Sequence, residues 1–240
     1  MEQMRLSRYL SQNSVCSRRA AEELIKQGRL KINGVTAQLG DKVDPDKDKI
    51  LLDGKAVRQG HKARSYFMLN KPRGYVTTLK DESGRKCVAD LISGINARVF
   101  YAGRLDKDSE GLLILTDDGE LANKLVHPSK HISKVYRVTV KTPHVSLDVL
   151  KQLRTGVVLD DGYKTLPAEV KVSLEDENKT VLLITIYEGK NRQIRRMCEA
   201  VGLEVMLLKR IAYGKLRLGG LRTGQYRILT DEEIAYLKSL

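Results

Sequence analysis

The stretch Gly103-Arg104-Leu105-Asp106-Lys107-Asp108-Ser109-Glu110-Gly111 runs directly into the apolar segment Leu112-Leu113-Ile114-Leu115-Thr116. The apolar segment is typical of a buried β-strand, and the acidic segment before it, bounded by glycines, is typical of a loop. An aspartate in such a loop has a fixed place against a dry core, which suits a carboxylate that acts as a nucleophile. Arg104, two residues before Asp106, points to the same side of an extended backbone.

Three interpretations of this loop compete. It is a solvated turn between strands, a calcium-binding loop, or the site of a catalytic aspartate. Its acidic residues and Gly111 follow the spacing of an EF-hand from Asp106 onward. Against calcium, Asp117 stands where that spacing normally has a glutamate, and the residues after Gly111 favour a strand. The rest of the chain decides among the three.

The chain carries a large excess of positive charge. Its 240 residues include 43 lysines and arginines and 30 acidic residues, the formal net charge is +13, and the isoelectric point is about 9.6. Residues 1–64 hold 14 of the basic and 8 of the acidic residues, so a quarter of the chain holds almost half of the excess. The expected partner is a polyanion, because cations that neutralise phosphates release counterions. An inert basic surface is the alternative.

Cys16, Cys87 and Cys198 are widely separated and form no Cys-x-x-Cys pair. This pattern indicates neither a disulfide framework nor a zinc site, and it is typical of a reducing compartment. No apolar run approaches the roughly 18 residues that a membrane span needs, and the first residues lack the apolar core of a signal peptide. We expect a soluble cytoplasmic protein with no membrane partner and no bound metal.

Residues 1–52 predict a small basic module of two helices and a small sheet. Apolar residues within 6–10 share one helical face, and Ser17 is a suitable N-cap for a second helix that ends at Gly28. Asn33-Gly34, between two β-like segments, predicts a hairpin with a type I′ turn.

Arg18 and Arg19 stand in the first turn of the second helix, where the helix dipole disfavours cations. A cationic first turn is explained if phosphates bind there.

Three segments of this module resemble the S4 RNA-binding domain. They are Arg5-Leu6-Ser7-Arg8-Tyr9-Leu10, Ser17-Arg18-Arg19-Ala20-Ala21-Glu22 and Gly28-Arg29-Leu30-Lys31-Ile32-Asn33-Gly34. The resemblance implies RNA binding without identifying the RNA. The candidate RNA contacts in this module are Arg5, Arg8, Arg18, Arg19, Arg29 and Lys31.

Residues 53–64 are polar, contain two glycines and show no period, so we interpret them as a linker. Residues 65–240 then form a second domain with strands and helices in alternation. The expected strands are 66–69, 75–78, 112–116, 134–140, 168–174 and 180–187. The expected helices are 119–126, 146–156, one capped by Asn191, and one that starts at Thr230 with a capping box to Glu233.

The helix after Asn191 has two unlike faces. Its apolar side packs on the sheet, and Arg192, Arg195, Arg196 and Glu199 share the other side at helical spacing. That cationic side is either a solvated charged surface or a contact for phosphates. We assign Arg192 and Arg196, together with Lys71, to RNA binding.

Residues 71–78, 103–120, 134–138 and 188–201 resemble, in order and spacing, the RsuA/RluB-type family of RNA pseudouridine synthases. With the S4-like module in front, the resemblance covers essentially the whole chain. The two most specific blocks are Gly103-Arg104-Leu105-Asp106 with its apolar tail and Glu188-Gly189-Lys190-Asn191-Arg192-Gln193-Ile194-Arg195-Arg196-Met197. The family implies an α+β fold, in which residues 65–240 form a mixed, largely antiparallel sheet with a central cleft.

The resemblance also implies roles for five residues. Asp106 matches the catalytic aspartate, Tyr136 the tyrosine that stacks on the target base, and Arg195 the basic residue paired with the aspartate. Leu208 matches the apolar residue of the base pocket. Arg104 matches the position whose side chain fills the space that a flipped base leaves.

The implied reaction converts uridine to pseudouridine in ribosomal RNA or a pre-ribosomal particle. It needs a carboxylate, a positive partner that keeps it ionised, and a dry pocket for a flipped base, but no redox cofactor. Whether the aspartate attacks the ribose C1′ or the base stays open. The order of segments favours the large-subunit RluB/RluF types, hence 23S over 16S RNA, and a monomer is expected. The alternative function is a non-catalytic RNA-binding or ribosome-assembly factor.

Overall fold

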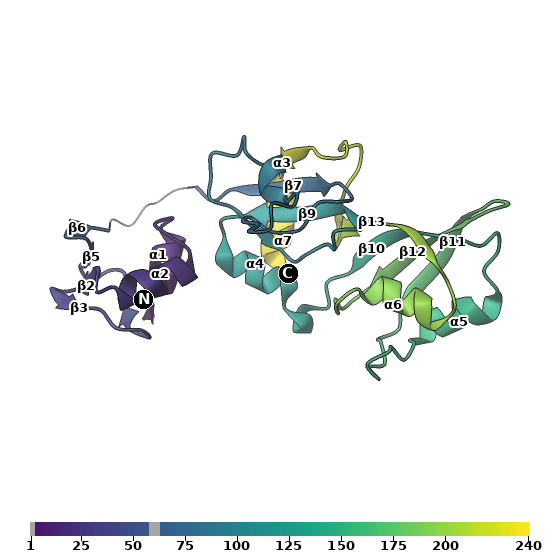
Figure 1. The fold of residues 1–240 in the computed structure, drawn as a ribbon, viewed down its shortest axis with the longest axis horizontal. Helices are drawn as coiled ribbons and strands as arrows, with labels where there is room; N and C mark the ends of the chain where they lie inside the picture. Colours follow the sequence, from purple (N-terminus) through teal and green to yellow (C-terminus); the bar gives the residue numbers. More distant parts are fainter. Residues whose placement is uncertain (1–2, 58–62) are drawn as a thin grey trace. The chain divides into compact units, whose positions relative to one another are not determined.

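The computed structural model describes residues 3–57 and 63–240, and the chain divides into two compact units, Met1–Arg64 and Ser65–Leu240. Figure 1 shows the helices and strands of each unit along the chain. Each unit has a hydrophobic core of its own: a small one in the first unit, and two larger clusters in the second.

The first unit contains two helices and short strands, as the sequence predicts. Strands β3, β2, β5 and β6 form one antiparallel sheet in that order, and β1 pairs with β4. The elements are β1 (Met4–Arg5), α1 (Leu6–Gln12), α2 (Arg18–Lys26), β2 (Leu30–Ile32), β3 (Val35–Thr36), β4 (Lys42–Val43), β5 (Ile50–Leu52) and β6 (Lys55–Ala56).

Local sequence signals set these elements. The Ser17 side chain accepts a hydrogen bond from the backbone N–H of Ala20 at 3.1 Å and so caps α2. Asn33 and Gly34 both have positive φ, 51° and 88°, as a type I′ turn between β2 and β3 requires. The predicted N-cap and hairpin turn are confirmed.

The predicted linker begins too early. Residues 53–57 belong to the first unit, because β6 pairs with β5 through Leu51↔Ala56 and Leu52↔Lys55 around a turn at Asp53-Gly54. This turn resembles a linker in sequence because its flanking strands are too short to show a period. Residues 58–62 of the proposed linker lie outside the described residues.

The second unit is built on a mixed sheet. Within the described residues it has the strand order β11-β12-β10-β13-β9-β7-β15, with β14 added to β13 and β8 to β9. Its strands are β7 (Tyr66–Lys71), β8 (Phe100–Ala102), β9 (Glu110–Thr116), β10 (Lys134–Val140), β11 (Glu169–Glu175), β12 (Thr180–Ile186), β13 (Val205–Tyr213), β14 (Leu216–Arg217) and β15 (Tyr226–Ile228). Its helices are α3 (Val88–Leu91), α4 (Gly119–Val126), η1 (Pro128–Lys130), α5 (Leu147–Thr155), α6 (Gln193–Ala200) and α7 (Asp231–Ser239).

The sheet consists of two antiparallel parts joined by one short parallel contact. Strands β11, β12, β10 and β13 pair antiparallel on one side, and β9, β7 and β15 do so on the other. Between them, β13 and β9 pair parallel through Lys209↔Glu110 and Arg210↔Gly111. The predicted α+β class with a mixed, largely antiparallel sheet is confirmed.

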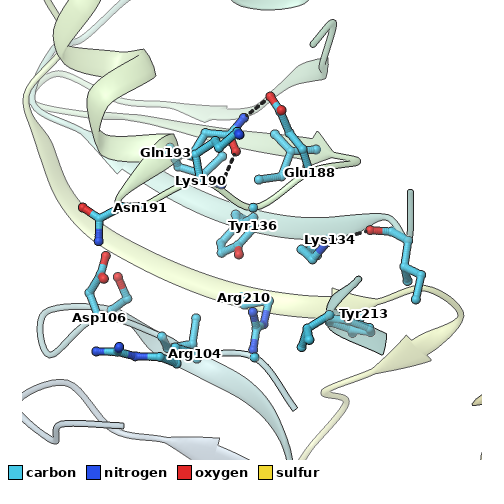
Figure 2. A pocket seen from close by; sticks show the side chains of 18 of the residues that line it. Arg104, Asp106, Lys134, Tyr136, Glu188, Lys190, Asn191, Gln193, Arg210 and Tyr213 are labelled. Carbon is cyan, nitrogen blue, oxygen red and sulfur yellow. Dashed lines mark hydrogen bonds between the residues drawn. The ribbon is translucent and has the colours of Figure 1, made fainter. Parts of the chain in front are cut away.

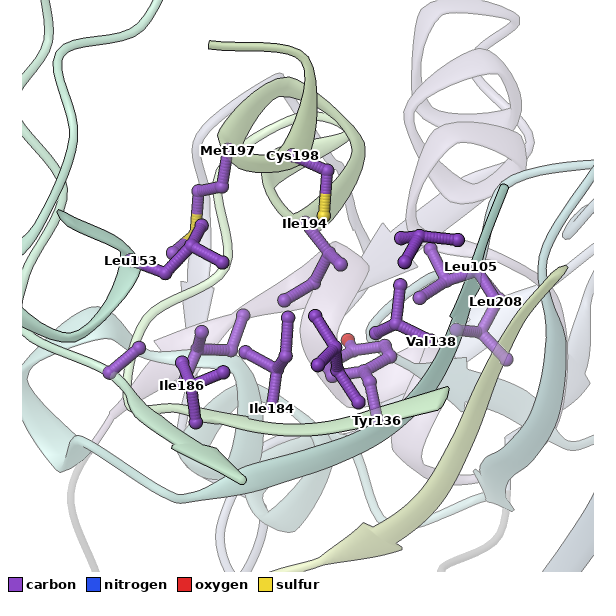
Figure 3. Packing of buried hydrophobic residues seen from close by; sticks show 14 of the residues in the cluster. Leu105, Tyr136, Val138, Leu153, Ile184, Ile186, Ile194, Met197, Cys198 and Leu208 are labelled. Atoms are coloured by element: carbon purple, nitrogen blue, oxygen red, sulfur yellow. The ribbon is translucent and has the colours of Figure 1, made fainter. Parts of the chain in front are cut away.

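Two apolar clusters flank this contact. Residues of α5 and α6, such as Leu153 and Met197, pack against Val138 and Ile184 of the first part of the sheet, as Figure 3 shows. Residues of α4 and α7 pack on β7 and β9 in the second cluster. The first cluster also includes buried leucines of β7 and β9, so apolar contacts join the two parts of the sheet.

The close approach of β9 and β13 requires a glycine. Gly111 has φ +109°, and a Cβ built on it would lie 2.7 Å from the backbone nitrogen of Arg210 and would overlap the carbonyl oxygen of the same residue. Any other residue would separate the strands or strain the backbone.

The EF-hand interpretation is wrong. The residues that would form the second half of a calcium loop are strand β9, buried from Gly111 onward. Asp117, at the last position of that spacing, is buried and accepts a hydrogen bond from the backbone N–H of Ser65 at 2.8 Å.

Several predictions about the second unit are confirmed and others are wrong. Helices α4, α5 and α7 lie where expected, with caps at Ser146 and Thr230. Residues 75–78 form no strand, and only Val76 makes an isolated bridge, to Cys87. The N-cap of α6 is Arg192 rather than Asn191, with φ 49°. The sequence analysis missed α3 and strands β8, β13, β14 and β15.

Gly111→Ala is expected to lower the free energy of unfolding by about 2–4 kcal/mol, because the added methyl group overlaps the backbone of β13 and the φ is unfavourable. Urea denaturation measures the loss. Gly220→Ala is the control, since a Cβ there meets nothing within 4 Å. Equal stability of the two variants would show that the strands separate at no cost.

Candidate active site

A cavity of about 610 Å³ lies where the two parts of the sheet meet. It is lined by the loop 103–109, by β10 and β13, and by the segment 186–194 that leads into α6. Figure 2 shows Asp106 toward one end of it, Tyr136 and Arg210 nearer the middle, and Lys134 and Tyr213 toward the other end. The volume is typical of a pocket for a small organic ligand.

Buried contacts fix the loop that carries Asp106. The hydroxyl of Thr77 donates to the carbonyl of Leu105 at 2.5 Å and accepts from the N–H of Leu105 at 3.2 Å. The backbone N–H of Ser109 donates to the carbonyl of Asp106 at 3.0 Å and closes the turn. The half-buried carboxylate of Asp106 is therefore held at the wall of the cavity by its own backbone.

Lys71 supports the same loop from beneath. Its side chain is fully buried, and Nζ donates to the carbonyl of Ser109 at 2.8 Å and to that of Pro72 at 2.9 Å. Burial lowers the pKa of Lys71 to about 8, although Asp106 and Asp108 act in the opposite direction. The predicted RNA contact at Lys71 is wrong, because a fully buried lysine cannot reach a phosphate.

Tyr136 and Leu208 form part of the apolar wall. Both are buried, at 8% and 4% exposed, and both line the cavity. They belong to the same apolar cluster as Leu105 and Ile194, and Figure 3 shows these side chains around one space. An aromatic face beside aliphatic side chains suits a flat ring such as a nucleobase.

Arg195 does not pair with Asp106. Its Nη2 donates to the backbone carbonyl of Asp108 at 2.9 Å and its Nη1 to that of Val205 at 3.3 Å, and no ion pair joins it to Asp106 in the described residues. Burial lowers the pKa of Arg195, a neighbouring Arg192 adds to this, and Asp108 and Asp106 oppose it. The hydrogen bonds of Arg195 therefore end on backbone carbonyls and not on the carboxylate.

The other arginines near the cavity have different surroundings. Arg104 and Arg192 are exposed and line it, so they are available to a ligand at its mouth. Arg196 forms ion pairs with Asp160 and Asp161, at 2.7 Å to the latter, and only 16% of its side chain is exposed. The phosphate contact at Arg196 stays a prediction, and a phosphate would have to compete with two carboxylates for it.

A polar network holds the segment before α6. Buried Glu188 accepts hydrogen bonds from the side chain of Gln193, the N–H of Leu166 and the hydroxyl of Tyr163, at 2.6, 2.9 and 2.6 Å. Gln193 in turn accepts from the N–H of Lys190 at 2.9 Å. The network ties the loop 157–166 to the start of α6 and fixes that wall of the cavity.

A half-buried lysine and a buried arginine line the far part of the cavity, and sequence reasoning missed both. Lys134 donates to the carbonyl of Ile132 at 3.0 Å, and burial together with Arg210 lowers its pKa to about 8 against the opposing effect of Glu188. Arg210 is 3% exposed, its Nε donates to the carbonyl of Leu112 at 2.8 Å, and its guanidinium lies 5.6 Å from the ring centre of Tyr213. Arg210 could have been found two residues after Leu208 if strand β13 had been predicted.

The cations proposed for RNA binding in the first unit differ in exposure. Arg5, Arg18, Arg19 and Lys31 are exposed, and Arg8 is half-buried. Arg29 makes two hydrogen bonds to the carboxylate of Asp53, at 2.9 and 2.5 Å. Arg29 therefore holds the turn of the β5–β6 hairpin, and a phosphate would have to compete with Asp53 for it.

The profile of the RNA pseudouridylate synthase family matches residues 65–200, and that of the S4 domain matches residues 4–50. The ribosomal large subunit pseudouridine synthase B of Bacillus subtilis is 45% identical to the chain over 239 residues, which is 98% of this chain and 96% of that protein. The chain belongs to the RNA pseudouridylate synthase family.

Other comparisons agree with this assignment. The dual-specificity RNA pseudouridine synthase RluF of Escherichia coli is 38% identical over 99% of this synthase and 79% of its own length. A crystal structure of a pseudouridylate synthase superposes with a TM-score of 0.69 at 31% identity, over 98% of this chain and 99% of that one. The RsuA/RluB-type resemblance is thereby confirmed, and so is the S4 domain. No helix among the described residues of the synthase is long and apolar enough to span a bilayer.

Lys71→Met tests the cost of the buried cation. Burial lowers the pKa of Lys71 from 10.5 to about 8 in the folded synthase. Between pH 8 and pH 10.5 the unfolded synthase therefore binds more protons than the folded one. The contribution of Lys71 to the free energy of unfolding rises with pH across this range. The free energy of unfolding of the wild type relative to Lys71→Met should therefore rise by roughly 1–3 kcal/mol between pH 8 and pH 10.5.

Urea denaturation at several pH values measures this difference. Lys107→Met, at an exposed lysine of the loop that carries Asp106, controls for the loss of a surface charge. A difference between wild type and Lys71→Met that stays constant from pH 8 to pH 10.5 would contradict the lowered pKa.

Proposed function

We propose that this synthase isomerises a uridine of ribosomal RNA to pseudouridine, with Asp106 as the nucleophile and 23S RNA as the substrate. The supporting observation is the position of Asp106: its backbone is anchored by Thr77 and Lys71, and its carboxylate stands at a cavity walled by Tyr136. The name of the Bacillus subtilis relative, a large-subunit synthase, favours 23S over 16S RNA.

The proposed reaction breaks the bond between the ribose C1′ and N1 of uracil and forms a bond between C1′ and C5. N1 gains a proton and C5 loses one, so atoms and charge balance and no electrons are transferred. Asp106 supplies the attacking carboxylate, Tyr136 stacks on the flipped base, and Leu208 excludes water from the ring. Arg104, exposed at the mouth, takes the place that the base leaves in the RNA helix.

Arg195 acts in this proposal as a positioning residue. It holds the carbonyl of Asp108 and so keeps the loop closed behind Asp106. Its charge, like that of Lys71, lies near the carboxylate of Asp106 without pairing with it.

Mapping of pseudouridine in 23S and 16S rRNA, from cells with and without the gene, tests the proposal. We expect a defined position in 23S rRNA to lose its pseudouridine in the deletion strain and to regain it when purified protein is added to that RNA. Unchanged maps of both RNAs would overturn the proposed substrate.

Asp106→Asn is expected to abolish turnover, at least about 10³-fold, while RNA affinity stays within a few-fold, because phosphate contacts dominate binding. Single-turnover assays and filter binding measure the two effects. The control is Asp108→Asn, an exposed carboxylate of the same loop that does not line the cavity. Comparable turnover of the wild type and Asp106→Asn would remove Asp106 from the reaction.

The S4 unit is expected to supply phosphate contacts through its exposed cations. The double substitution Arg18→Gln and Arg19→Gln, at the first turn of α2, should weaken RNA binding and reduce the slope of log K against log salt by roughly 1–2. Lys55→Gln, on strand β6, serves as the control for a single exposed charge. A salt slope equal to that of the wild type would show that this turn of α2 does not touch RNA.

A further inference from the structure

The guanidinium of Arg210 lacks an acceptor for one of its buried nitrogens. Its Nε is bound to the carbonyl of Leu112, but Nη2 is buried with no hydrogen-bond partner in the described residues. Arg210 is 3% exposed and lines the cavity that also holds Asp106. A buried donor of a charged group that stays unpaired is costly, so a ligand in the cavity is expected to provide the acceptor.

Two features place this donor at the edge of a base instead of at a phosphate. Arg210 follows Leu208 by two residues on β13, and it is the register partner of Tyr136 on β10. A ring that stacks on Tyr136 therefore brings its edge toward Arg210. Phosphates stay with the RNA backbone at the mouth, where the exposed cations Arg104 and Arg192 lie.

We propose that Arg210, through Nη2, donates a hydrogen bond to O4 of the target uracil and thereby selects uracil over cytosine. This inference rests on the proposed function, since it requires a flipped uridine in the cavity. Cytosine carries an amino group at the same position, and two donors that face each other leave both unsatisfied. A site built to bond one polar atom rejects an analogue that lacks it.

The symmetry of uracil makes one donor useful throughout the reaction. C5 takes the place of N1 when the ring makes a half-turn about the line through C6 and N3, and the same half-turn exchanges O2 and O4. A donor that holds O4 of uridine therefore meets O2 of pseudouridine in the same place. Arg210 can hold the ring before and after the turn without moving, and its Nε bond to Leu112 keeps it there.

Atomic substitution in the RNA tests the contact. The probe is a synthetic RNA fragment around the mapped uridine, with uridine, 4-thiouridine or 2-thiouridine at the target, because sulfur accepts hydrogen bonds weakly. Single-turnover rates are measured for the wild type, Arg210→Met and Arg210→Lys. Arg137→Met, at an exposed arginine of β10, is the matched control. Melting temperatures report folding, and Arg210→Lys keeps the charge if Arg210→Met does not fold.

The expected result is a coupling between Arg210 and O4 alone. On uridine, the Arg210 variants should be slower by roughly 10- to 100-fold. The penalty for a thio substitution is the single-turnover rate on uridine divided by the rate on the thiouridine. For 4-thiouridine this penalty should be about 10-fold larger in the wild type and in Arg137→Met than in the Arg210 variants. For 2-thiouridine it should be the same in all four proteins. Equal penalties for 4-thiouridine in all proteins, or a coupling to 2-thiouridine, would overturn the proposal. A wild type that makes no pseudouridine in the uridine fragment would instead overturn the proposed function.

Competition tests the selectivity separately. The fragment with cytidine at the target should inhibit the wild type at least about 10-fold more weakly than a product fragment with pseudouridine, and Arg210→Met should reduce this difference. Unchanged discrimination in Arg210→Met would show that another group rejects cytosine.

Discussion

The cavity depends on the contact between Gly111 of β9 and the backbone of Arg210 of β13. Two apolar clusters pack against the sheet, and its two antiparallel parts meet at the two parallel residue pairs of β9 and β13. The loop of Asp106 leads into one of these strands, and Leu208 and Arg210 lie on the other. The carboxylate, the apolar wall and the buried cation therefore come together through one close approach that only glycine permits.

Cations hold the loop of Asp106 through its backbone. Lys71 donates to the carbonyl of Ser109 from beneath, and Arg195 donates to the carbonyl of Asp108 from α6. Because both bonds end on carbonyl oxygens, the positive charges lie near Asp106 without forming a direct ion pair with it. This arrangement leaves the carboxylate oxygens of Asp106 available to a ligand in the cavity.

Much of the fold and part of the site could be predicted from the sequence. Helix caps and tight turns depend only on neighbouring residues, so they could be predicted. The caps at Ser17 and Ser146 and the turn at Asn33-Gly34 are examples. The resemblance located Asp106, Tyr136 and Leu208, and the structure brings them to one cavity. The prediction for Lys71 was wrong because burial decides whether a lysine can reach RNA, and the sequence does not distinguish a buried lysine from an exposed one. The ion pairs of Arg196 could not be predicted either, because its partners come from a distant loop that no local pattern indicates.

The cations in the far wall of the cavity lower the stability of the synthase. Lys134 and Arg210 have lost water on folding, and for Lys134 the effect of burial outweighs the attraction of Glu188. Apolar residues of similar volume would raise thermal stability at these two positions, but an apolar residue at position 210 could not donate the hydrogen bond proposed for Arg210. Selection for heat resistance alone would therefore be expected to replace Lys134 and Arg210 first. Engineering of a more robust enzyme should leave these two positions unchanged and begin at the solvent-facing side of β11.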